Sequence, residues 1–286
     1  MSDTALIVGV GDIHGRFHRV GTWLDTLEHA LGRPLDAVLA VGDVEAFATA
    51  DDHRRKAAKR TMPAEFAAFA RGESRMPRPF YFIGGNNEDF ESLHAMREGG
   101  EVAPGVHYLG RVGRATIAGV QVGWLSGIYA PKWLDTALQA PTTAATRKQA
   151  GYFRRGELER LRGERQIDLL LTHEWPRGLF ARPPGKPVRP WMGNPLTREL
   201  VDEVQPPWLL CGHSHERFAA TLHHPGGLQT RVACLDEAAE PEGAVIWMEW
   251  SGGQPVRVGW GIDGHVSWTP AQAWGAVRGA TVRSVP

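Results

Sequence analysis

The sequence predicts an α/β fold in which two packed, mixed β-sheets are flanked by helices. Three observations lead to this prediction. Short apolar runs lead to turn residues, a segment with helical spacing separates the first two runs, and the last third of the chain has short runs between Gly and Pro turns. Short apolar runs bounded by turn residues are typical of buried strands. A strand, a helix and a second strand in succession are typical of an α/β unit with a right-handed crossover.

The first expected sheet is built from the apolar runs. Arg16–Leu31, between two of them, has apolar residues at helical spacing and is followed by Gly32 and Pro34, so we expect a helix there. The runs expected to be buried strands are Ala5–Val10, Ala37–Val41, Phe80–Ile83, Ile167–Leu171 and Trp208–Leu210.

The remaining elements are expected to be shorter. Tyr108–Leu125 alternates around Gly113 and Gly119, which predicts two hairpin-linked strands, and Glu157–Leu161 predicts the start of a short helix. Four runs after His215 predict antiparallel strands of a second sheet packed on the first: Phe218–Leu222, Arg231–Leu235, Ala244–Trp250 and Val256–Trp260. We expect one domain over residues 1–263 and a loosely held C-terminal tail over residues 264–286.

Two long segments look like insertions. Residues 45–79 are mostly helical by composition and carry the basic residues Arg54, Arg55, Lys56, Lys59 and Arg60. Residues 129–155 are rich in loop-forming, basic and aromatic residues. Loops of this length in a compact domain are usually functional or disordered, so both segments are candidates for contacts with a ligand.

The composition excludes several classes of protein. A formal net charge of zero over 286 residues does not indicate a globally basic nucleic-acid binder. The N-terminus lacks the pattern of a signal peptide, and no apolar run is long enough to span a membrane. Cys211 and Cys234 are too few for a disulfide framework, so we expect a cytoplasmic protein.

Residues that bind metal ions follow the apolar runs. The segments are Gly11-Asp12-Ile13-His14-Gly15, Gly42-Asp43, Gly85-Asn86-Asn87-Glu88, Thr172-His173-Glu174-Trp175-Pro176 and Gly212-His213-Ser214-His215. Any one of these alone would be a common turn, but together each follows an expected strand. Because ligands bind beyond the carboxyl ends of strands in an open α/β sheet, we expect these side chains along one rim of the sheet.

The ligand types indicate the chemistry. Mixed oxygen and nitrogen donors suit Mn, Fe or Zn rather than calcium. Two divalent ions about 3.5–4 Å apart, bridged by a carboxylate, convert a bound water to hydroxide near neutral pH and hold the oxygens of a phosphate ester. The sequence therefore predicts a two-metal phosphoesterase in which this hydroxide is the nucleophile.

The order of these motifs resembles that of the calcineurin-like metallophosphoesterases, and within them the RNA lariat debranching enzymes. Gly42-Asp43-Val44-Glu45-Ala46 resembles Gly-Asp-Phe-Gln-Ala of that branch. Further segments that look like the branch are Phe82–Asn86, Val102–Gly110, Leu125–Tyr129, Thr172–Arg177, His215–Ala220 and Ala233–Asp236. The resemblance covers residues 5–250 and not the longer C-terminal region of the eukaryotic members, as expected of a bacterial-type member. It implies the metallophosphoesterase fold.

The resemblance also implies two metal positions. Asp12, His14, Asp43 and His215 would hold the first ion; Asp43, Asn86, His173 and His213 would hold the second, with Asp43 bridging. Debranching enzymes often have Cys where Asp12 stands. The carboxylate of Asp12 therefore favours a filled first position.

Asn87 departs from the family motif Gly-Asn-His-Glu, whose His is thought to protonate the leaving oxygen or to stabilise the transition state. A general acid is typically worth about 10²–10⁴ in rate, and Asn cannot give up a proton. Three hypotheses follow: His94 or another group supplies the proton, the substrate has a better leaving group, or the protein is a slow enzyme or a binding relic. A deliberate substitution is a further alternative. The candidate catalytic residues are Asn87, His94 and His14.

An RNA substrate needs phosphate contacts and stacking surfaces. In the family, residues 129–155 correspond to the loop that recognises the lariat. Candidate substrate-binding residues are Tyr129, Lys132, Trp133, Arg147, Lys148, Tyr152, Phe153, Arg154, Arg155 and Trp175. The basic residues of the 45–79 insertion could follow an RNA backbone or form a solvated helix face. We expect a phosphodiesterase acting on RNA or nucleotides; the alternatives are a phosphomonoesterase, a cyclic-nucleotide phosphodiesterase, or a catalytically weak nucleic-acid-binding protein.

Overall fold

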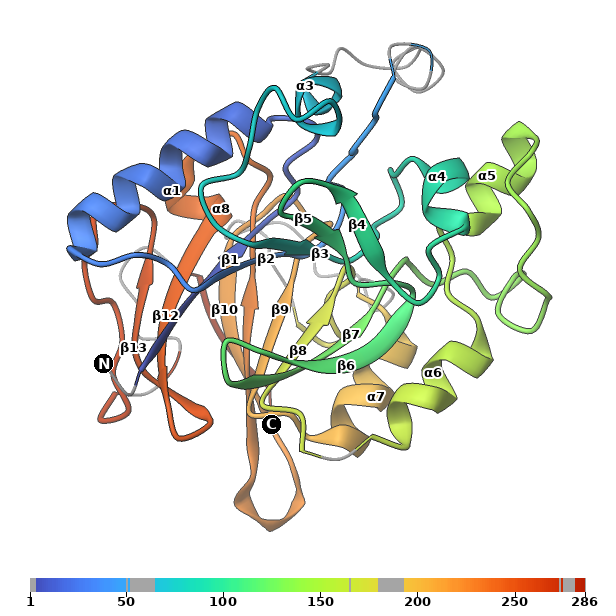
Figure 1. Ribbon diagram of the computed structural model, residues 1–286. Coiled ribbons are helices and arrows are strands. Elements are labelled where there is room, and N and C mark those ends of the chain that lie inside the picture. Colours follow the sequence, from blue (N-terminus) through green and yellow to red (C-terminus); the bar gives the residue numbers. More distant parts are fainter. Residues whose placement is uncertain are drawn as a thin grey trace.

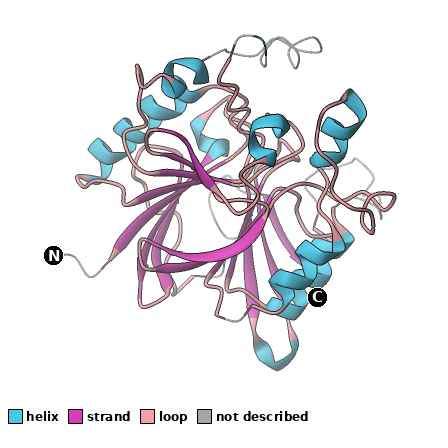
Figure 2. Ribbon diagram, turned by 45° about the vertical axis from the view of Figure 1, so that its right-hand side comes forward, coloured by secondary structure: helices cyan, strands magenta, loops and turns pink. Residues whose placement is uncertain are grey.

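Two seven-stranded β-sheets pack face to face, and helices lie on their outer sides (Figures 1 and 2). The structure, a computed structural model, describes residues 4–49, 51, 65–164, 166–179, 193–272, 274 and the backbone of 281–285. The architecture confirms the predicted α/β class with two packed, mixed sheets flanked by helices.

The first sheet has the strand order β13-β12-β1-β2-β3-β5-β4. Its parallel strands are β1 (Ala5–Val10), β2 (Ala37–Ala40), β3 (Phe80–Phe82) and β5 (Val106–Tyr108). Its antiparallel strands are β4 (Gly100–Ala103), β12 (Val245–Ser251) and β13 (Gln254–Trp260). Helices on this side are α1 (Phe17–Leu31), α3 (Phe66–Ala70), α4 (Phe90–His94) and the short α8 (Pro241–Ala244).

The second sheet has the order β14-β10-β11-β9-β8-β7-β6. Its strands are β6 (Val112–Ile117), β7 (Val120–Leu125), β8 (Leu169–Thr172), β9 (Trp208–Cys211), β10 (Phe218–His223), β11 (Gln229–Cys234) and β14 (Thr281–Val285). The 3-10 turn η1 (Pro225–Gly227) joins β10 to β11. Helices α5 (Ala144–Ala150), α6 (Arg155–Arg162) and α7 (Pro195–Val204) complete this side.

The predicted division of strands between the two sheets is wrong. β8 and β9 were expected in the first sheet but pair with β7 and β11 in the second. β12 and β13 were expected in the second sheet, yet β12 pairs antiparallel with β1. Alternation and length predict a strand but carry no information on which distant strand becomes its neighbour.

Three hydrophobic layers stabilise the sandwich. Alternate residues of each strand face opposite sides of their sheet, because successive side chains of a strand point in opposite directions. Val8 and Val38 pack with the buried face of α1, whereas Ile7 and Leu39 face Leu171 and Leu210 of the other sheet. Leu170 and Leu209 pack in a third layer with Leu158 of α6 and Leu200 of α7.

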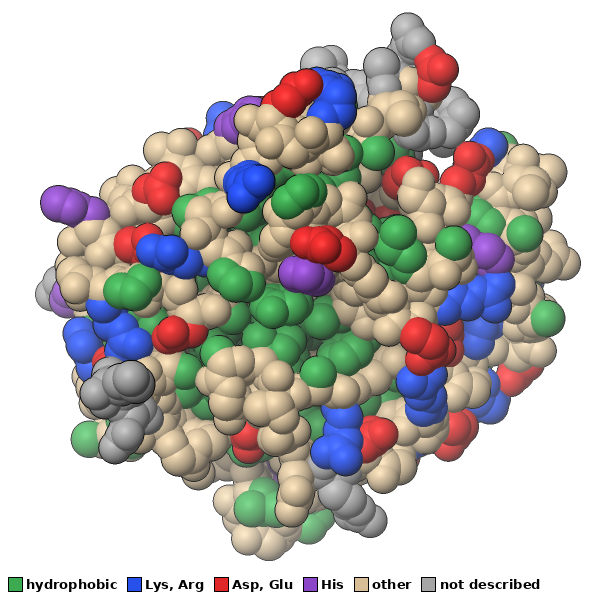
Figure 3. Space-filling model, viewed as in Figure 1, with side chains coloured by type: hydrophobic (Ala, Val, Ile, Leu, Met, Phe, Trp, Pro, Cys, Tyr) green, Lys and Arg blue, Asp and Glu red, His purple; other side chains and the backbone are tan. Residues whose placement is uncertain are grey.

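The edges of the two sheets near β4, β5 and β6 are open. A cavity of about 590 Å³ lies there, lined by Tyr81 and His107 of the first sheet and by Trp124 of the second, with Arg114 and Arg160 at its rim. Figure 3 shows hydrophobic side chains in this hollow, surrounded by charged residues.

The described residues of the C-terminal segment pack on the domain, which differs from the loosely held tail expected from residue 264. Trp268 and Trp274 are buried and lie edge-on to Trp208, with ring centroids 5.3 and 4.7 Å from its own. β14 pairs in parallel with β10. The predicted tail from residue 264 therefore contributes to the second sheet and its core.

The two expected insertions differ in what the structure describes. The basic residues at 54–60 lie outside the described residues, and the described remainder of the 45–79 insertion contains the short helix α3. Residues 129–155 form turns, helix α5 and the first residue of α6, and bury Leu134 and Phe153 in the third layer. None of the helices in the described parts of the chain has the length and apolarity needed to cross a membrane.

Candidate metal centre

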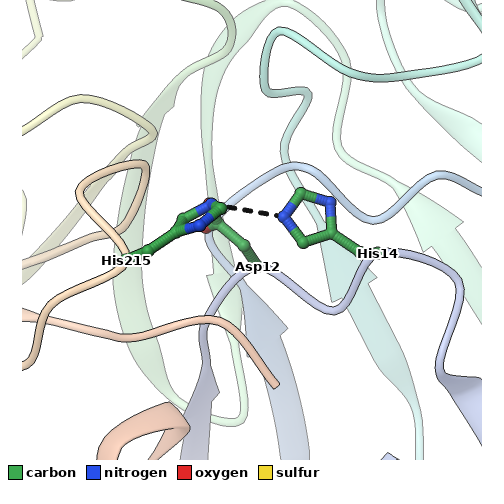
Figure 4. Close-up of side chains that lie close together, drawn as sticks. All are labelled: Asp12, His14 and His215. Atoms are coloured by element: carbon green, nitrogen blue, oxygen red, sulfur yellow. Dashed lines mark hydrogen bonds and ion pairs between the residues drawn. The ribbon is translucent and has the colours of Figure 1, made fainter. Parts of the chain in front are cut away.

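The first cluster consists of Asp12, His14 and His215, whose candidate ligand atoms all lie within 4.8 Å of one another. Asp12 and His14 are on the loop after β1, and His215 is on the loop after β9. The Nε2 atoms of His14 and His215 are 3.3 Å apart, and His215 Nε2 is 3.2 Å from Asp12 Oδ2. Figure 4 shows the two imidazoles pointing toward one another, with Asp12 beside them.

The second cluster consists of Asp43, His173 and His213, again with candidate ligand atoms within 4.8 Å. Asp43 follows β2, His173 follows β8 and His213 follows β9. The amide oxygen of Asn86, on the loop after β3, lies 3.2 Å from His173 Nε2. The predicted ligands thus converge, but from the rims of two sheets rather than from one.

The loops that carry the ligands adopt unusual backbone conformations. His14, Asp43, His213 and His215 have positive φ angles between 45° and 64°, as does Glu45. Residues other than Gly rarely occupy this region, and the cost is typical of functional sites. Gly85 is required by close approach, because a Cβ atom there would lie 2.2 Å from Asp43 Oδ1. The loops therefore place the ligand side chains at the cost of a strained backbone.

Buried hydrogen bonds fix the tautomers of two ligand imidazoles. His14 Nδ1 lies 2.7 Å from Glu45 Oε1, and His173 Nδ1 lies 2.9 Å from the carbonyl oxygen of Val41. Since a carbonyl oxygen and a carboxylate both accept, each Nδ1 donates its hydrogen. The lone pair of each Nε2 therefore points into its cluster, as metal binding requires.

Glu88 is a functional residue that the sequence interpretation missed. Its carboxylate accepts hydrogen bonds from the backbone N–H groups of Gly85, Val44 and Glu45 at 2.8–3.0 Å, and so joins the loop after β2 to the loop after β3. Burial and the charge of Asp43 raise the pKa of Glu88 to about 8. The sequence could have indicated this role, because Glu88 lies two residues after Asn86 and a Glu in such a loop can accept from nearby backbone amides.

The electrostatics of the clusters favour bound cations. Burial alone would raise the pKa of Asp43, but His173, His14 and a hydrogen bond from Asn87 lower it to about 2. Burial and the neighbouring His173 lower the pKa of His213 to about 4, which leaves its imidazole neutral at pH 7. Asp12 and Asp43 raise the pKa values of His173 and His215, so the carboxylates also attract positive charge to these positions. Carboxylates beside imidazoles are the donor set that Mn, Fe or Zn takes. The residues present thus fit two divalent ions.

The three candidate catalytic residues occupy different places. His14 belongs to the first cluster. Asn87 lies at the second cluster, where it donates from its backbone N and from Nδ2 to the two carboxylate oxygens of Asp43. His94 belongs to neither cluster; its Nε2 is 2.6 Å from Arg97 Nη2, and it lines a small cavity with Tyr108 and Arg111. These contacts do not support His94 as a proton donor.

The segment 129–155 is anchored beside the second cluster at both ends. The N–H of Gly127, just before it, donates to the Gly84 carbonyl (2.7 Å), and the Tyr129 N–H donates to Glu174 Oε2 (2.6 Å). Near the other end, a Cβ atom on Gly151 would lie 3.4 Å from Asn86 Cα. Glu174 was also missed by the sequence interpretation, although it directly follows His173.

Among the predicted substrate-binding residues, the aromatic side chains are the ones best placed to contact a ligand near the second cluster. Trp175 is half-buried, with its ring centroid 6.2 Å from that of His213. The ring of half-buried Tyr129 stacks on buried Phe153. Exposed Lys132 lies over the ring of Trp133, at 4.7 Å.

Several predicted cationic contacts are engaged within the protein. Arg154 is buried, and its guanidinium donates to the carbonyl oxygens of Tyr152 (2.8 Å) and Gln149 (3.3 Å). Arg147 forms an ion pair with Glu91. Arg155 pairs with Asp135 at 2.6 Å. The expectation that Arg154 contacts the substrate is therefore not supported, because its two Nη atoms donate to main-chain oxygens and its side chain is buried.

A two-sheet sandwich whose strand ends carry two Asp/His clusters defines a metallophosphoesterase. The calcineurin-like phosphoesterase family matches residues 5–217, and the chain belongs to that family. The protein is therefore a phosphoric ester hydrolase by family, as the sequence predicted, and its two Asp/His clusters are candidate sites for a pair of metal ions.

Curated relatives point to one branch of the family. The lariat debranching enzyme of Mus musculus is 28% identical over 250 residues, which cover 79% of this chain and 46% of the mouse protein. The lariat debranching enzyme of Homo sapiens is 29% identical over 75% of this chain and 42% of its own length, and that of Saccharomyces cerevisiae 27% identical over 75% and 58%. The chain therefore spans about half the length of the curated relatives it matches.

Solved structures show the same fold. TT1561 of Thermus thermophilus has a TM-score of 0.51 and 12% identity, covering 91% of this chain and 99% of that protein. Another crystal structure has a TM-score of 0.54 and 14% identity, covering 86% of this chain and 95% of the other.

Proposed function

We propose that this metallophosphoesterase is a phosphodiesterase acting on RNA, of the kind that cleaves 2′,5′-linked branches. The observation that carries the proposal is the anchoring of segment 129–155 and Trp175 beside the second cluster. Half-buried aromatic rings next to a phosphate site suit the stacking of splayed bases. The similarity to lariat debranching enzymes supports the same substrate class.

The residues of the two clusters would hold two metal ions, and these ions would contact the scissile phosphate. Asp12, His14 and His215 would hold one ion, and Asn86, His173 and His213 the other, with Asp43 as the proposed bridge. When bound, two such ions lower the pKa of a water molecule and neutralise charge on the phosphate oxygens. The low pKa of Asp43 keeps its carboxylate ionised throughout the physiological range.

Asn87 stabilises the charge of Asp43 but has no proton to give to a leaving oxygen. Its backbone N–H and its side-chain amide each donate a hydrogen bond to the Asp43 carboxylate. Since His94 is engaged with Arg97, the hypotheses of a better leaving group or of a slow enzyme are the better supported ones. We propose that the chain cleaves RNA at a modest rate, because residue 87 supplies no proton to the alcohol leaving group.

Arg147 pairs with Glu91, and Arg154 donates to main-chain carbonyl oxygens. These contacts favour a second candidate, a phosphomonoesterase or cyclic-nucleotide phosphodiesterase acting on small esters. With these two cations engaged inside the protein, fewer are free for a long RNA backbone than the sequence indicates.

A substrate panel distinguishes the two candidates. The full chain is loaded with Mn²⁺ or Fe²⁺ and given a synthetic 2′,5′-branched RNA, its linear 3′,5′ counterpart, a cyclic nucleotide and a nitrophenyl phosphate. We expect the branched RNA to be cleaved at the 2′,5′ bond with the highest kcat/KM. Turnover of small esters alone would overturn the RNA proposal and leave the second candidate.

A variant tests the metal-dependent mechanism in the same assay. Asp43→Ala removes the proposed bridge and should reduce activity by about 10³-fold or more, since ion clamping of the transition state is worth several kcal/mol. Asp263→Ala, which removes an exposed carboxylate outside segment 129–155, is the matched control. Activity that survives Asp43→Ala would contradict the mechanism.

A further inference from the structure

His14 of the first cluster contacts Glu45, which lies on the loop after β2. In the branch motif the residue at the position of Glu45 is Gln, whereas here it is a carboxylate. Glu45 Oε1 lies 2.7 Å from His14 Nδ1, and both side chains are almost completely buried, at 0% and 3% exposed. A carboxylate acceptor gives a shorter and stronger hydrogen bond than an amide oxygen.

Backbone hydrogen bonds hold the loop of Glu45 in place without the His14 imidazole. The Glu45 N–H donates to Glu88 Oε2 at 2.8 Å, and Glu45 itself has a φ angle of 58°. The two loops are also joined by backbone hydrogen bonds, from the His14 N–H to the Asp43 carbonyl (2.9 Å) and from the Gly15 N–H to the Val44 carbonyl (3.0 Å). The carboxylate is therefore positioned before the imidazole binds anything.

This arrangement has a direct consequence for the first cluster. Because Nδ1 donates to Glu45, the lone pair of His14 Nε2 faces His215 and the first cluster. A carboxylate behind a metal-binding imidazole fixes its tautomer and orientation and makes it a stronger donor. The second cluster has a neutral counterpart, since His173 Nδ1 donates to the Val41 carbonyl oxygen.

We propose that Glu45 is the positioning residue of the first metal position and selectively strengthens ion binding there. Together with Asp12, which replaces the Cys often found in the branch, it surrounds His14 with two carboxylates. These two carboxylates add negative charge at the first position, which therefore takes a hard divalent ion such as Mn²⁺ more tightly than it would without Glu45. The proposal rests on the metal centre and not on the identity of the ester, so a failure of RNA cleavage leaves it standing.

Ion binding to the metal-free full chain tests the proposal. Isothermal titration with Mn²⁺ should show two binding steps in the wild type. Glu45→Gln keeps the volume and an acceptor oxygen but removes the charge, and should weaken one step by about 10-fold; Glu45→Ala should weaken it by up to about 100-fold. The other step should be unchanged in both variants. Two unchanged steps, or an equal loss in both steps, would overturn the proposal.

The matched control is Asp168→Asn. Asp168 is a half-buried carboxylate that accepts from the Gln121 N–H (3.0 Å) just before β8, and so lies at the opposite end of that strand from His173. Both of its binding steps should equal those of the wild type. Thermal unfolding of the metal-free proteins identifies any variant whose loss of binding comes from misfolding. If Glu45→Ala does not fold, the binding steps of Glu45→Gln decide the test.

A second measurement reads the tautomer directly. In long-range proton–nitrogen spectra of the Zn²⁺-loaded chain, the His14 signals are assigned by their loss in His14→Gln. We expect His14 to carry its hydrogen on Nδ1, with a strongly downfield proton that moves upfield in Glu45→Gln. A proton signal that Glu45→Gln leaves in place would contradict the role of the carboxylate.

Discussion

Asn87 donates two hydrogen bonds to Asp43, from its backbone N to Oδ1 at 2.7 Å and from Nδ2 to Oδ2 at 2.6 Å. Both carboxylate oxygens of the proposed bridging ligand are thus held by one residue. Asn87 stands at the position where the family motif has His, so the residue that would act as an acid instead orients a ligand.

Replacing Asn87 by His should restore the missing proton donor. We expect Asn87→His to raise kcat on a phosphodiester with an alcohol leaving group by about 10²-fold, the lower range for a positioned general acid. A bis-nitrophenyl phosphate, whose leaving group needs no proton, serves as the control and should change little. Equal rates for wild type and variant on both esters would show that residue 87 is not at the proton-donor position.

Trp175 should contribute to binding a base and not to the chemical step. Its ring lies 6.2 Å from that of His213, is partly buried, and is oriented by a hydrogen bond from Nε1 to the Leu179 carbonyl oxygen (3.1 Å). Stacking is worth about 1–3 kcal/mol per base, so Trp175→Ala should raise KM for RNA about tenfold or more with kcat nearly unchanged. KM for a small nitrophenyl ester is the internal comparison. A parallel rise of KM for the small ester would point to a general disturbance of the second cluster.

Arg154 should act in folding and not in substrate binding. Its guanidinium donates to the carbonyl oxygens of Tyr152 and Gln149, and charged hydrogen bonds of this kind contribute about 1.5–3 kcal/mol. Arg154→Met should lower the free energy of unfolding by about 2 kcal/mol in urea denaturation and leave KM for RNA unchanged. Lys132→Met, at an exposed position of the same segment, should show the opposite pattern. A raised KM with unchanged stability in Arg154→Met would restore the sequence-based assignment.

His224 should make stability fall with acidification. It is buried, its Nε2 is 2.8 Å from Thr230 Oγ1, and burial lowers its pKa despite the charge of Asp202. The unfolded chain therefore binds a proton near pH 6.5 that the folded chain resists, so stability is lost as pH falls below about 6.5. Urea unfolding of metal-free wild type and His224→Gln should converge between about pH 7.5 and pH 5, because the wild type loses more stability. Parallel pH profiles would assign the acid sensitivity to other groups.

Short-range features of the sequence predicted most of the central strands and helix α1, and they singled out the residues of the two clusters. The runs before Asp12, Asp43 and His173 each became a strand that ends one to three residues before the cluster residue. This worked because a buried strand and its terminal turn are both set by neighbouring residues, through apolar content and through the residues that tolerate tight turns.

Long-range packing decided the rest. β8 and β9 belong to the second sheet, so that the metal centre joins two sheets. Arg154 faces carbonyl oxygens inside the protein, while Glu45 and Glu88 reach residues 31 and 44 positions away in the chain. The type of a side chain shows which contacts it can make. Which of them it does make depends on burial and on neighbours that are distant in sequence, and only the folded chain brings these together.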